Sequence, residues 1–315
     1  MGSPADDIYS RSAGLIENDA LMHKRVLVIG LGSFGSVIAV DLARAAVGNF
    51  ALMDFDRLER HNVVRHACFL KDVGRLKTEA VEELILGKNP YAKVDKFALD
   101  MNDDLGLLAS EIDKSDIVIC ATDNNKSRFN LSRVLVKHPK VCLFGRAVTR
   151  AEGGDVFRYR PGGPCYCCLV GNEWYDAAAE EITDKASARA NGRIAAYVSD
   201  EDADALVQVG LASDIEPMTN MMVKLALVEL SRGTNAGISA LEQELTYDYY
   251  MWANRRERRH RNWKAFPDAG NGPTILRWYG AMIQRNDGCA LCSTGGIRLD
   301  EGADYEAQLE SLPEA

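Results

Sequence analysis

A glycine-rich segment near the N-terminus has the composition of a phosphate-binding loop. Gly30-Leu31-Gly32-Ser33-Phe34-Gly35 has the spacing G-x-G-x-x-G. Glycines let the backbone turn tightly and approach a phosphate, and the start of a following helix attracts negative charge. Asp54 lies about 20 residues further on, where a carboxylate that binds a ribose is expected. Together they predict a nucleotide site; a tight strand–helix turn without a ligand is the alternative.

Five polar residues follow this segment and suit a triphosphate better than a dinucleotide. They are Asp56, Asn62, Arg65, Lys77 and Asp123. A nicotinamide or flavin enzyme has no need for an asparagine, an arginine and a lysine at the mouth of its nucleotide site. Cations neutralise charge on an α-phosphate and on departing pyrophosphate, and a carboxylate at a strand end can hold Mg²⁺. We therefore expect ATP and Mg²⁺, although each residue taken singly could be a cap or a surface charge.

The eight cysteines include two C-x-x-C pairs, Cys165 with Cys168 and Cys289 with Cys292. Four thiolates in this arrangement are typical of a closed, tetrahedral structural zinc site. Two redox pairs or plain buried thiols are the alternatives. Cys167 lies between two of the expected ligands and is not counted as one. The sequence therefore predicts that Zn²⁺ ties the C-terminal region back to the end of the nucleotide-binding half.

Alternating strands and helices must position these side chains. Short apolar runs predict buried strands, and helical periodicity predicts helices. The expected strands are residues 25–30, 50–54, 94–98, 116–120, 141–146 and 155–159, and the expected helices are 34–46, 76–87, 125–137 and 215–231. Aromatic-rich residues 245–252 and 274–284 predict further strands or short helices. The fold class is α/β: a Rossmann-like, mostly parallel sheet with helices on both faces and an antiparallel extension in the C-terminal half.

The chain shows no repeat or low-complexity linker that would separate two domains. We expect one domain over residues 1–315. Its parts are a nucleotide-binding half (25–150), a half that binds the substrate and zinc (151–298) and an acidic tail (299–315). Residues 171–205 are polar and alanine-rich, so we expect a partly helical crossover segment. The methionine-rich face of residues 215–231 is expected to belong to the core.

Composition and charge narrow the class of protein. The chain is 47% hydrophobic and 26% charged, like ordinary globular proteins. It has no apolar run of the ~18 residues that a membrane helix needs, and its first residues do not resemble a signal peptide, so we expect a cytoplasmic protein. The net charge of −9 argues against nucleic acid as the partner. The basic run at residues 255–264 is either a solvated face or a docking surface for an acidic protein or a phosphate.

These segments resemble the ThiF/MoeB/HesA superfamily, which includes the adenylation domains of ubiquitin-activating enzymes. The resemblance extends from about residue 9 to residue 292. Its carriers stand in the family's order and spacing: RVLVIGLGSFGS, LMDFDRLERHNVVRH, VGRLKTEA, ICATDN and the paired cysteine motifs. The resemblance implies that Gly30, Gly32 and Gly35, with Ser33 between them, hold the phosphates of ATP. It also implies that Asp54 binds the ribose.

The same resemblance implies the catalytic residues. Asn62, Arg65 and Lys77 would contact the phosphates and stabilise the transition state, and Asp123 would coordinate Mg²⁺. Arg11 lies where the family places an arginine that reaches into the partner subunit's site. This position implies a symmetric homodimer with composite active sites.

The implied reaction is ATP-dependent adenylation of the C-terminal carboxylate of a ubiquitin-like or sulfur-carrier protein ending in Gly-Gly. The products are an acyl-adenylate and pyrophosphate. The carboxylate is already ionised, so catalysis rests on positioning and charge stabilisation. Residues 169–288 contain no cysteine, so we do not expect the thioester step of ubiquitin transfer. Cys68 is expected to be a core residue, and Cys167 is confined between metal ligands.

Two features differ from the sulfur-carrier enzymes. Arg65-His66 replaces the common Arg-Gln, and the segments around Trp252 and Trp278 are unlike theirs. Both are similar to ThiF-like proteins encoded in bacterial operons beside ubiquitin-like proteins and JAB-type peptidases, which makes conjugation or antiviral defence a hypothesis. Alternative functions are adenylation of a short peptide or a small-molecule carboxylate, a non-catalytic subunit of a heterodimeric activating enzyme, and, least favoured, a dehydrogenase.

Overall fold

The computed structural model describes residues 8–148, 151–171, 210–255 and 275–293. These residues build one eight-stranded sheet in the order β3-β2-β1-β4-β5-β6-β7-β8. The strands are β1 (Arg25–Ile29), β2 (Asn49–Met53), β3 (Lys93–Phe97), β4 (Ile117–Cys120), β5 (Cys142–Ala147), β6 (Gly153–Tyr159), β7 (Tyr249–Ala253) and β8 (Arg277–Ala281). Strands β1 to β5 pair in parallel, and β6, β7 and β8 add antiparallel pairs. The predicted parallel sheet with an antiparallel extension is confirmed.

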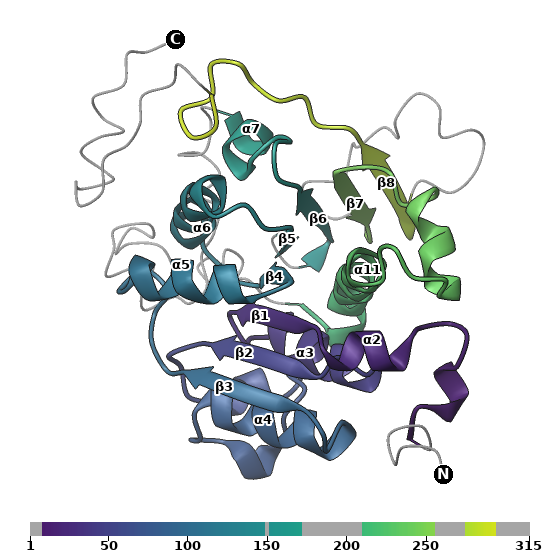
Figure 1. The fold of residues 1–315 in the computed structure, drawn as a ribbon. Coiled ribbons are helices and arrows are strands. Elements are labelled where there is room, and N and C mark those ends of the chain that lie inside the picture. The colour runs from purple at the N-terminus through teal and green to yellow at the C-terminus, as the bar shows by residue number, and fades with distance from the viewer. Residues whose placement is uncertain (1–7, 149–150, 172–209, 256–274, 294–315) are drawn as a thin grey trace, which may run out of the picture.

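Helices cover both faces of this sheet. The α-helices are α2 (Asn18–Met22), α3 (Gly35–Arg44), α4 (Lys77–Lys88), α5 (Leu105–Lys114), α6 (Asn125–Lys137), α7 (Tyr166–Val170) and α11 (Ala212–Leu230). Short 3-10 helices are η1 (Ser10–Ser12), η2 (Arg60–Asn62), η3 (Leu70–Asp72) and η6 (Gly237–Glu242). Figure 1 shows α11 on one side of the central strands and α5, α6 and α7 on the other.

The alternation of side chains along β1 explains the two layers of helices. Val26 and Val28 belong to one core cluster, and Leu27 and Ile29 to the other, with at most 1% of each residue exposed. Helices α3, α4 and α11 contribute to the first cluster, and α5, α6 and α7 to the second. A strand buried on both faces reads as a continuous apolar run, which is how β1 stands in the sequence.

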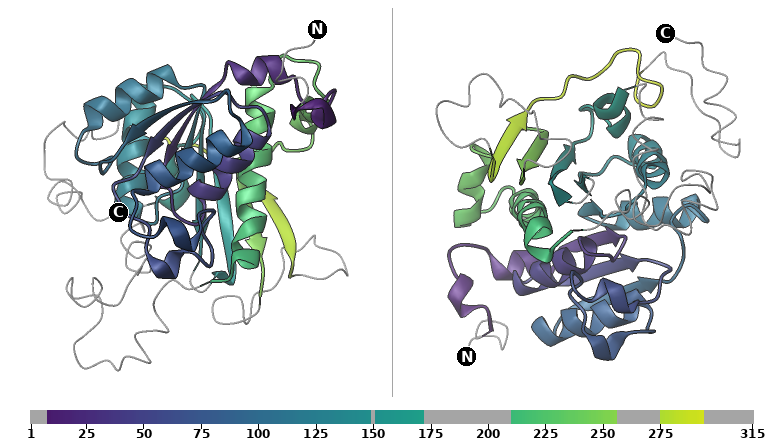
Figure 2. Two further views of the ribbon diagram at one scale, coloured as in Figure 1. Left: turned by 90° about the horizontal axis from the view of Figure 1, so that it is seen from below. Right: turned by 180° about the vertical axis from the view of Figure 1, so that it is seen from behind.

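The antiparallel half of the sheet packs closely on α11. Met218 and Met222 of this helix are fully buried. A Cβ atom added to Gly154 would overlap the sulfur of Met218, and one added to Gly145 would overlap that of Met222. The predicted core role of the methionines is confirmed. The right-hand view of Figure 2 shows the first strands (purple to blue) and the last (green to yellow) at opposite ends of the sheet.

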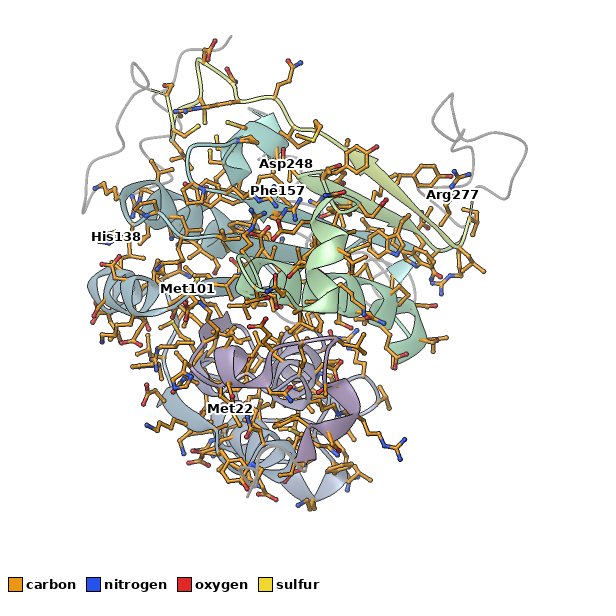
Figure 3. All side chains as sticks on the ribbon, turned by 45° about the vertical axis from the view of Figure 1, so that its right-hand side comes forward. Met22, Met101, His138, Phe157, Asp248 and Arg277 are labelled. Atoms are coloured by element: carbon orange, nitrogen blue, oxygen red, sulfur yellow. The ribbon has the colours of Figure 1, made fainter. Side chains whose placement is uncertain are left out.

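Helix α5 was not among the predicted elements. Asp104 caps it by accepting a hydrogen bond from the Leu107 N–H, and Leu108 and Ile112 bury its apolar face. In Figure 3, Phe157 lies in the interior, while His138 and Arg277 lie near opposite edges of the view. Three predicted segments fall outside the described residues: the crossover segment at 171–205 apart from Gly171, most of the basic run at 255–264, and the tail at 299–315. Within the described ranges, no helix combines the length and the apolar character needed to cross a bilayer.

Candidate active site

The glycine loop connects β1 to α3 and uses its glycines for different purposes. Gly30 has a φ of +82°, and a Cβ there would lie 2.8 Å from the Ala121 carbonyl oxygen. A Cβ on Gly35 would overlap the Gly30 carbonyl, so Gly35 lets the start of α3 pack on the loop. Gly32 has open space where a side chain would stand. Gly30 and Gly35 therefore shape the loop, whereas Gly32 leaves its backbone accessible.

Asp54, directly after β2, holds this loop and the next turn. Its Oδ2 accepts a hydrogen bond of 2.6 Å from the Leu31 N–H, and its Oδ1 accepts one of 2.8 Å from the Asp56 N–H. Burial raises the pKa of the Asp54 carboxyl, while the charge of Lys77 acts in the opposite direction. Asp54 thus fixes the backbone at the carboxyl ends of two adjacent parallel strands, where α/β sheets bind ligands.

Lys77 begins α4 beside these acids. Its Nζ lies 2.6 Å from Asp56 Oδ2 and 3.9 Å from Asp54 Oδ1, and 10% of its side chain is exposed. The Lys77 N–H also donates to the Asp56 carbonyl. The ammonium is therefore held at the wall of the site by carboxylates from the segment after β2.

Asn62 and Arg65 lie in and just after the 3-10 turn η2. The Asn62 side chain accepts a hydrogen bond of 2.9 Å from the Glu59 N–H, which fixes the turn. Burial lowers the pKa of the Arg65 guanidinium, and the negative charge of Asp123 partly offsets this effect. Arg65 and Asp123 therefore interact electrostatically, although they follow different strands.

These residues surround one cavity of about 870 Å³. Nine of the predicted site residues line it: Gly30, Gly32, Ser33, Asp54, Asp56, Asn62, Arg65, Lys77 and Asp123. Two do not. Gly35 packs beneath the loop, and Arg11 is exposed in η1, away from this cavity. The wall also includes Asp100 and Met101 after β3 and Ala147 at the end of β5.

The structure adds lining residues that the sequence analysis missed. Arg128 of α6 donates to the Thr122 carbonyl at 2.6 Å and to Asn125 at 3.1 Å, so it orders the turn that carries Asp123. Arg146 of β5 pairs with Asp155 of β6 at 2.7 Å. His66 lies beneath the glycine loop. Position at the carboxyl end of a predicted strand was an available signal for Arg146. The contacts of His66 and Arg128 carry no comparable local pattern.

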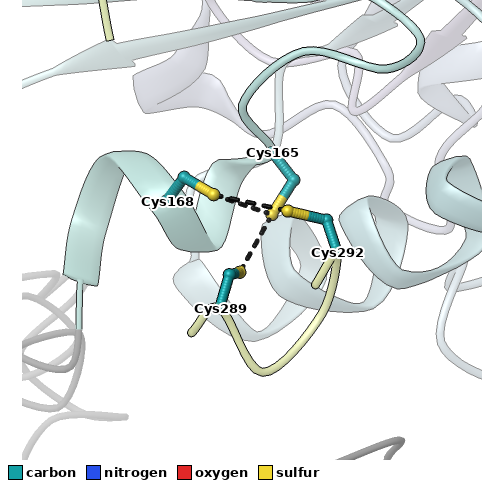
Figure 4. Close-up of side chains that lie close together, drawn as sticks. All are labelled: Cys165, Cys168, Cys289 and Cys292. Carbon is teal, nitrogen blue, oxygen red and sulfur yellow. Dashed lines mark hydrogen bonds between the residues drawn. The ribbon is translucent and has the colours of Figure 1, made fainter. Parts of the chain in front are cut away.

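The four predicted cysteine ligands converge as Figure 4 shows. Cys165 Sγ lies 3.5 Å from Cys289 Sγ, Cys168 Sγ lies 3.4 Å from Cys292 Sγ, and all four sulfurs lie within 4.8 Å of one another. A tetrahedron with Zn–S bonds of about 2.3 Å has sulfur–sulfur edges of roughly 3.8 Å. The four thiols are not joined as disulfides. Their spacing therefore fits a four-thiolate zinc site, and Cys167 is not part of the cluster.

A model of the ThiF family matches residues 9–250, so the chain belongs to the ThiF family. This agrees with the resemblance stated from the sequence motifs.

Two relatives of the chain are adenylyltransferases by name. The chain is 35% identical over 153 residues to the molybdopterin-synthase adenylyltransferase of Escherichia coli. The aligned segment covers 48% of this chain and 60% of the relative. It is 31% identical over 172 residues to the adenylyltransferase and sulfurtransferase MOCS3 of Drosophila virilis. This aligned segment covers 52% of this chain and 38% of the relative. The matches thus span less than two thirds of the length of these relatives.

Solved structures share the fold at low sequence identity. Escherichia coli MccB with ATP aligns with a TM-score of 0.59 and 18% identity, over 88% of this chain and 68% of MccB. PaaA aligns with a TM-score of 0.62 and 14% identity, over 90% of this chain and 84% of PaaA. At such identities the likeness shows the fold alone.

Proposed function

We propose that this chain is an ATP-dependent adenylyltransferase that activates a carboxylate. One observation carries the proposal: a single cavity joins the open backbone at Gly32, the carboxylate of Asp54 and the cations Lys77 and Arg65. Asn62 and Asp123 line the same cavity. The family membership of the chain and the names of its relatives support this assignment.

The proposed step is one displacement at phosphorus. A carboxylate oxygen of the substrate attacks the α-phosphorus of ATP and forms a carbon–oxygen–phosphorus linkage. The bond from the α-phosphorus to the oxygen that bridges to the β-phosphate breaks, and pyrophosphate leaves with the electron pair. No proton moves, because the carboxylate is already ionised. The protein's task is therefore to position the reactants and stabilise the charge of the transition state.

The described side chains suit these tasks. Lys77 is held by Asp56, whose side chain is 48% exposed, so a phosphate could replace this partner at little cost. Arg65 is half-buried, and a partly dehydrated guanidinium interacts strongly with an oxyanion. Asp123 is exposed at the end of β4, where its carboxylate suits a magnesium ion. A Mg²⁺ ion held there would neutralise charge on the triphosphate.

The carboxylate is proposed to be the C-terminus of a ubiquitin-like or sulfur-carrier protein. The names of the curated relatives favour this class. A short peptide is the second candidate, because the fold also matches MccB in complex with N-formylated MccA. Comparing the two substrate classes in the same assay would distinguish them.

A thioester intermediate is not part of the proposal. Cys68, Cys120 and Cys142 are at most 2% exposed. Burial raises the pKa of the Cys68 thiol to about 12, so it does not supply a thiolate at neutral pH. Four of the remaining cysteines form the proposed zinc site.

Arg11 is proposed to act in the cavity of a second copy of the chain, since it lies outside the cavity of its own. Mixing Arg11→Ala protein with Lys77→Ala protein should then restore activity, because one site of each mixed dimer keeps both residues. A mixture of Lys77→Ala and Asp123→Ala should stay inactive, because both residues serve the same cavity. If the first mixture is as inactive as the second, the composite site is wrong.

The proposed reaction is tested by ATP–pyrophosphate exchange with candidate substrates of both classes. We expect exchange with one class, and a decrease of about 10²- to 10³-fold for Lys77→Ala and for Asp123→Ala. Lys88→Ala, which removes a lysine at the other end of α4, is the matched control and should exchange normally. Exchange that survives both substitutions would show that another mechanism operates.

A further inference from the structure

His66 lies beneath the glycine loop and has no part in the displacement described above. It is 8% exposed and lines the cavity. Its Nε2 lies 2.6 Å from the Leu31 carbonyl oxygen, and its Nδ1 lies 3.0 Å from the backbone nitrogen of Cys68. The ring therefore connects the segment after β2 to the middle of the loop.

The two contacts determine which ring nitrogen carries the proton. A backbone N–H can only donate, so the Cys68 N–H requires a lone pair on Nδ1. The proton of the neutral ring is then on Nε2, which donates it to the Leu31 carbonyl. Burial lowers the pKa of His66 to about 4; the positive charge of Lys77 lowers it further, and the hydrogen bond to Leu31 and the charge of Asp72 oppose this. At neutral pH the ring is an uncharged donor.

The backbone of Leu31 is held at both of its polar groups. Its N–H donates to Asp54, and its carbonyl accepts from His66. The peptide unit that joins Leu31 to Gly32 is planar and trans, so the Gly32 N–H points opposite to the Leu31 carbonyl. Gly32 lines the cavity and has open space around it. Anchoring the carbonyl on His66 therefore turns the Gly32 N–H away from the histidine.

We propose that His66 is a positioning residue, which fixes the Leu31–Gly32 peptide so that the Gly32 N–H is presented to a phosphate of the bound nucleotide. The inference rests on the proposed function only for the identity of that nucleotide. A preoriented backbone donor favours a phosphate because it needs no reorganisation when the anion arrives. The role belongs to a backbone group, so a search for charged side chains overlooks it.

Two substitutions separate the contacts of the ring. His66→Asn places an amide near the position of Nδ1 and can still accept from Cys68, but it is too short to reach Leu31. His66→Gln places its amide nitrogen near the position of Nε2 and can donate to Leu31. We expect His66→Asn to raise the dissociation constant of MgATP about tenfold. We expect His66→Gln to stay within about threefold of the unchanged protein.

Adenosine is the probe that distinguishes a phosphate contact from a general disturbance. Displacement of a fluorescent ATP analogue measures both ligands, and adenosine affinity should be the same in all three proteins. Equal losses of MgATP and adenosine affinity in His66→Asn would overturn the proposal. So would a loss in His66→Gln as large as that in His66→Asn.

A structural control accounts for loss of stability. Ile112→Ala removes buried side-chain atoms from α5 on the opposite face of the sheet and should lower the melting temperature without changing MgATP affinity. If His66→Asn yields no folded protein, His66→Leu fills the same space without a donor and should show the same selective loss. Because nucleotide binding is measured without a carboxylate substrate, a protein that binds MgATP but catalyses no exchange leaves this inference standing and removes only the proposed reaction.

Discussion

Lys77 and Arg158 are both cations with little exposed surface, yet their surroundings differ. Lys77 lies at the wall of a cavity and contacts the carboxylates of Asp54 and Asp56. The fully buried Arg158 donates to the carbonyls of Leu245 and Tyr247 at 2.6 and 2.7 Å. It also pairs with Glu229 of α11, which accepts from Arg160 and Arg232 as well. The first cation faces a space for a ligand, and the second joins β6, α11 and the segment before β7.

This contrast extends to the two halves of the sheet. The parallel half gathers a group of polar side chains at the carboxyl ends of its strands, around the cavity. The antiparallel half uses its charges and thiols to connect segments far apart in the chain, as between Cys165 and Cys289. Substitutions of cavity-lining residues in the parallel half should therefore change ligand binding, and those of connecting residues in the antiparallel half should change stability.

Loss of the thiolate cluster should have the largest effect. We expect about one zinc ion per chain, and its binding contributes folding free energy on the order of 10 kcal/mol in small zinc domains. Cys292→Ser should lose zinc, measured by mass spectrometry of the purified protein, and unfold at much lower temperature. Cys167→Ser should retain zinc, because Cys167 is not one of the four clustered residues. Equal zinc loss in both variants would contradict the assignment of the ligands.

Arg158→Met should lower the free energy of unfolding by about 3–5 kcal/mol, because it breaks a buried ion pair and leaves two carbonyls without their donor. Urea denaturation measures this change. Arg232→Ala also removes a partner of Glu229, but Arg232 is 47% exposed, so a loss below about 1 kcal/mol is expected. MgATP affinity should be unchanged in both. A large loss of affinity in Arg158→Met would mean that the two halves are coupled.

The pH dependence of stability should report His66. Its folded pKa is lowered to about 4, below the ordinary histidine value of 6.5, so between these values the unfolded chain binds a proton that the folded protein does not. Stability should fall as pH decreases through this window, by at most about 3 kcal/mol from this group. The raised pKa of Asp54 acts in the opposite direction. The difference between the unchanged protein and His66→Gln isolates the histidine, and identical profiles would contradict its buried, neutral state.

The smallest effect is expected from two glycines. Gly154→Ala should lower the free energy of unfolding by about 1–3 kcal/mol, because the added methyl group overlaps Met218. Gly87→Ala, in helix α4 with open space around it, should be neutral or stabilising by up to about 1 kcal/mol. Denaturant midpoints of the two variants provide the comparison. Similar destabilisation in both would argue against tight packing of α11 on β6.

Local sequence patterns predicted much of the fold and of the candidate site. The apolar run at β1, the glycine loop and the residues at strand ends are short-range signals, and the structure places Asp54, Lys77 and Asp123 around one cavity. Helix α5 was not predicted, although its apolar residues 105, 108 and 112 recur at helical spacing. The contact of His66 with Leu31 joins positions 35 residues apart and depends on how two strand ends meet. Such a contact follows from tertiary packing and produces no periodic pattern in the sequence.

Phosphorus-31 NMR of the reaction products tests directly whether this protein transfers an adenylyl group from ATP to a carboxylate. The protein is mixed with ATP, Mg²⁺ and a carboxylate substrate that supports exchange. We expect pyrophosphate together with an adenylate bound to the substrate, or AMP once that adenylate is hydrolysed. We expect neither ADP nor inorganic phosphate as a primary product. Formation of ADP and phosphate would show cleavage at the γ-phosphate and would contradict an adenylation site.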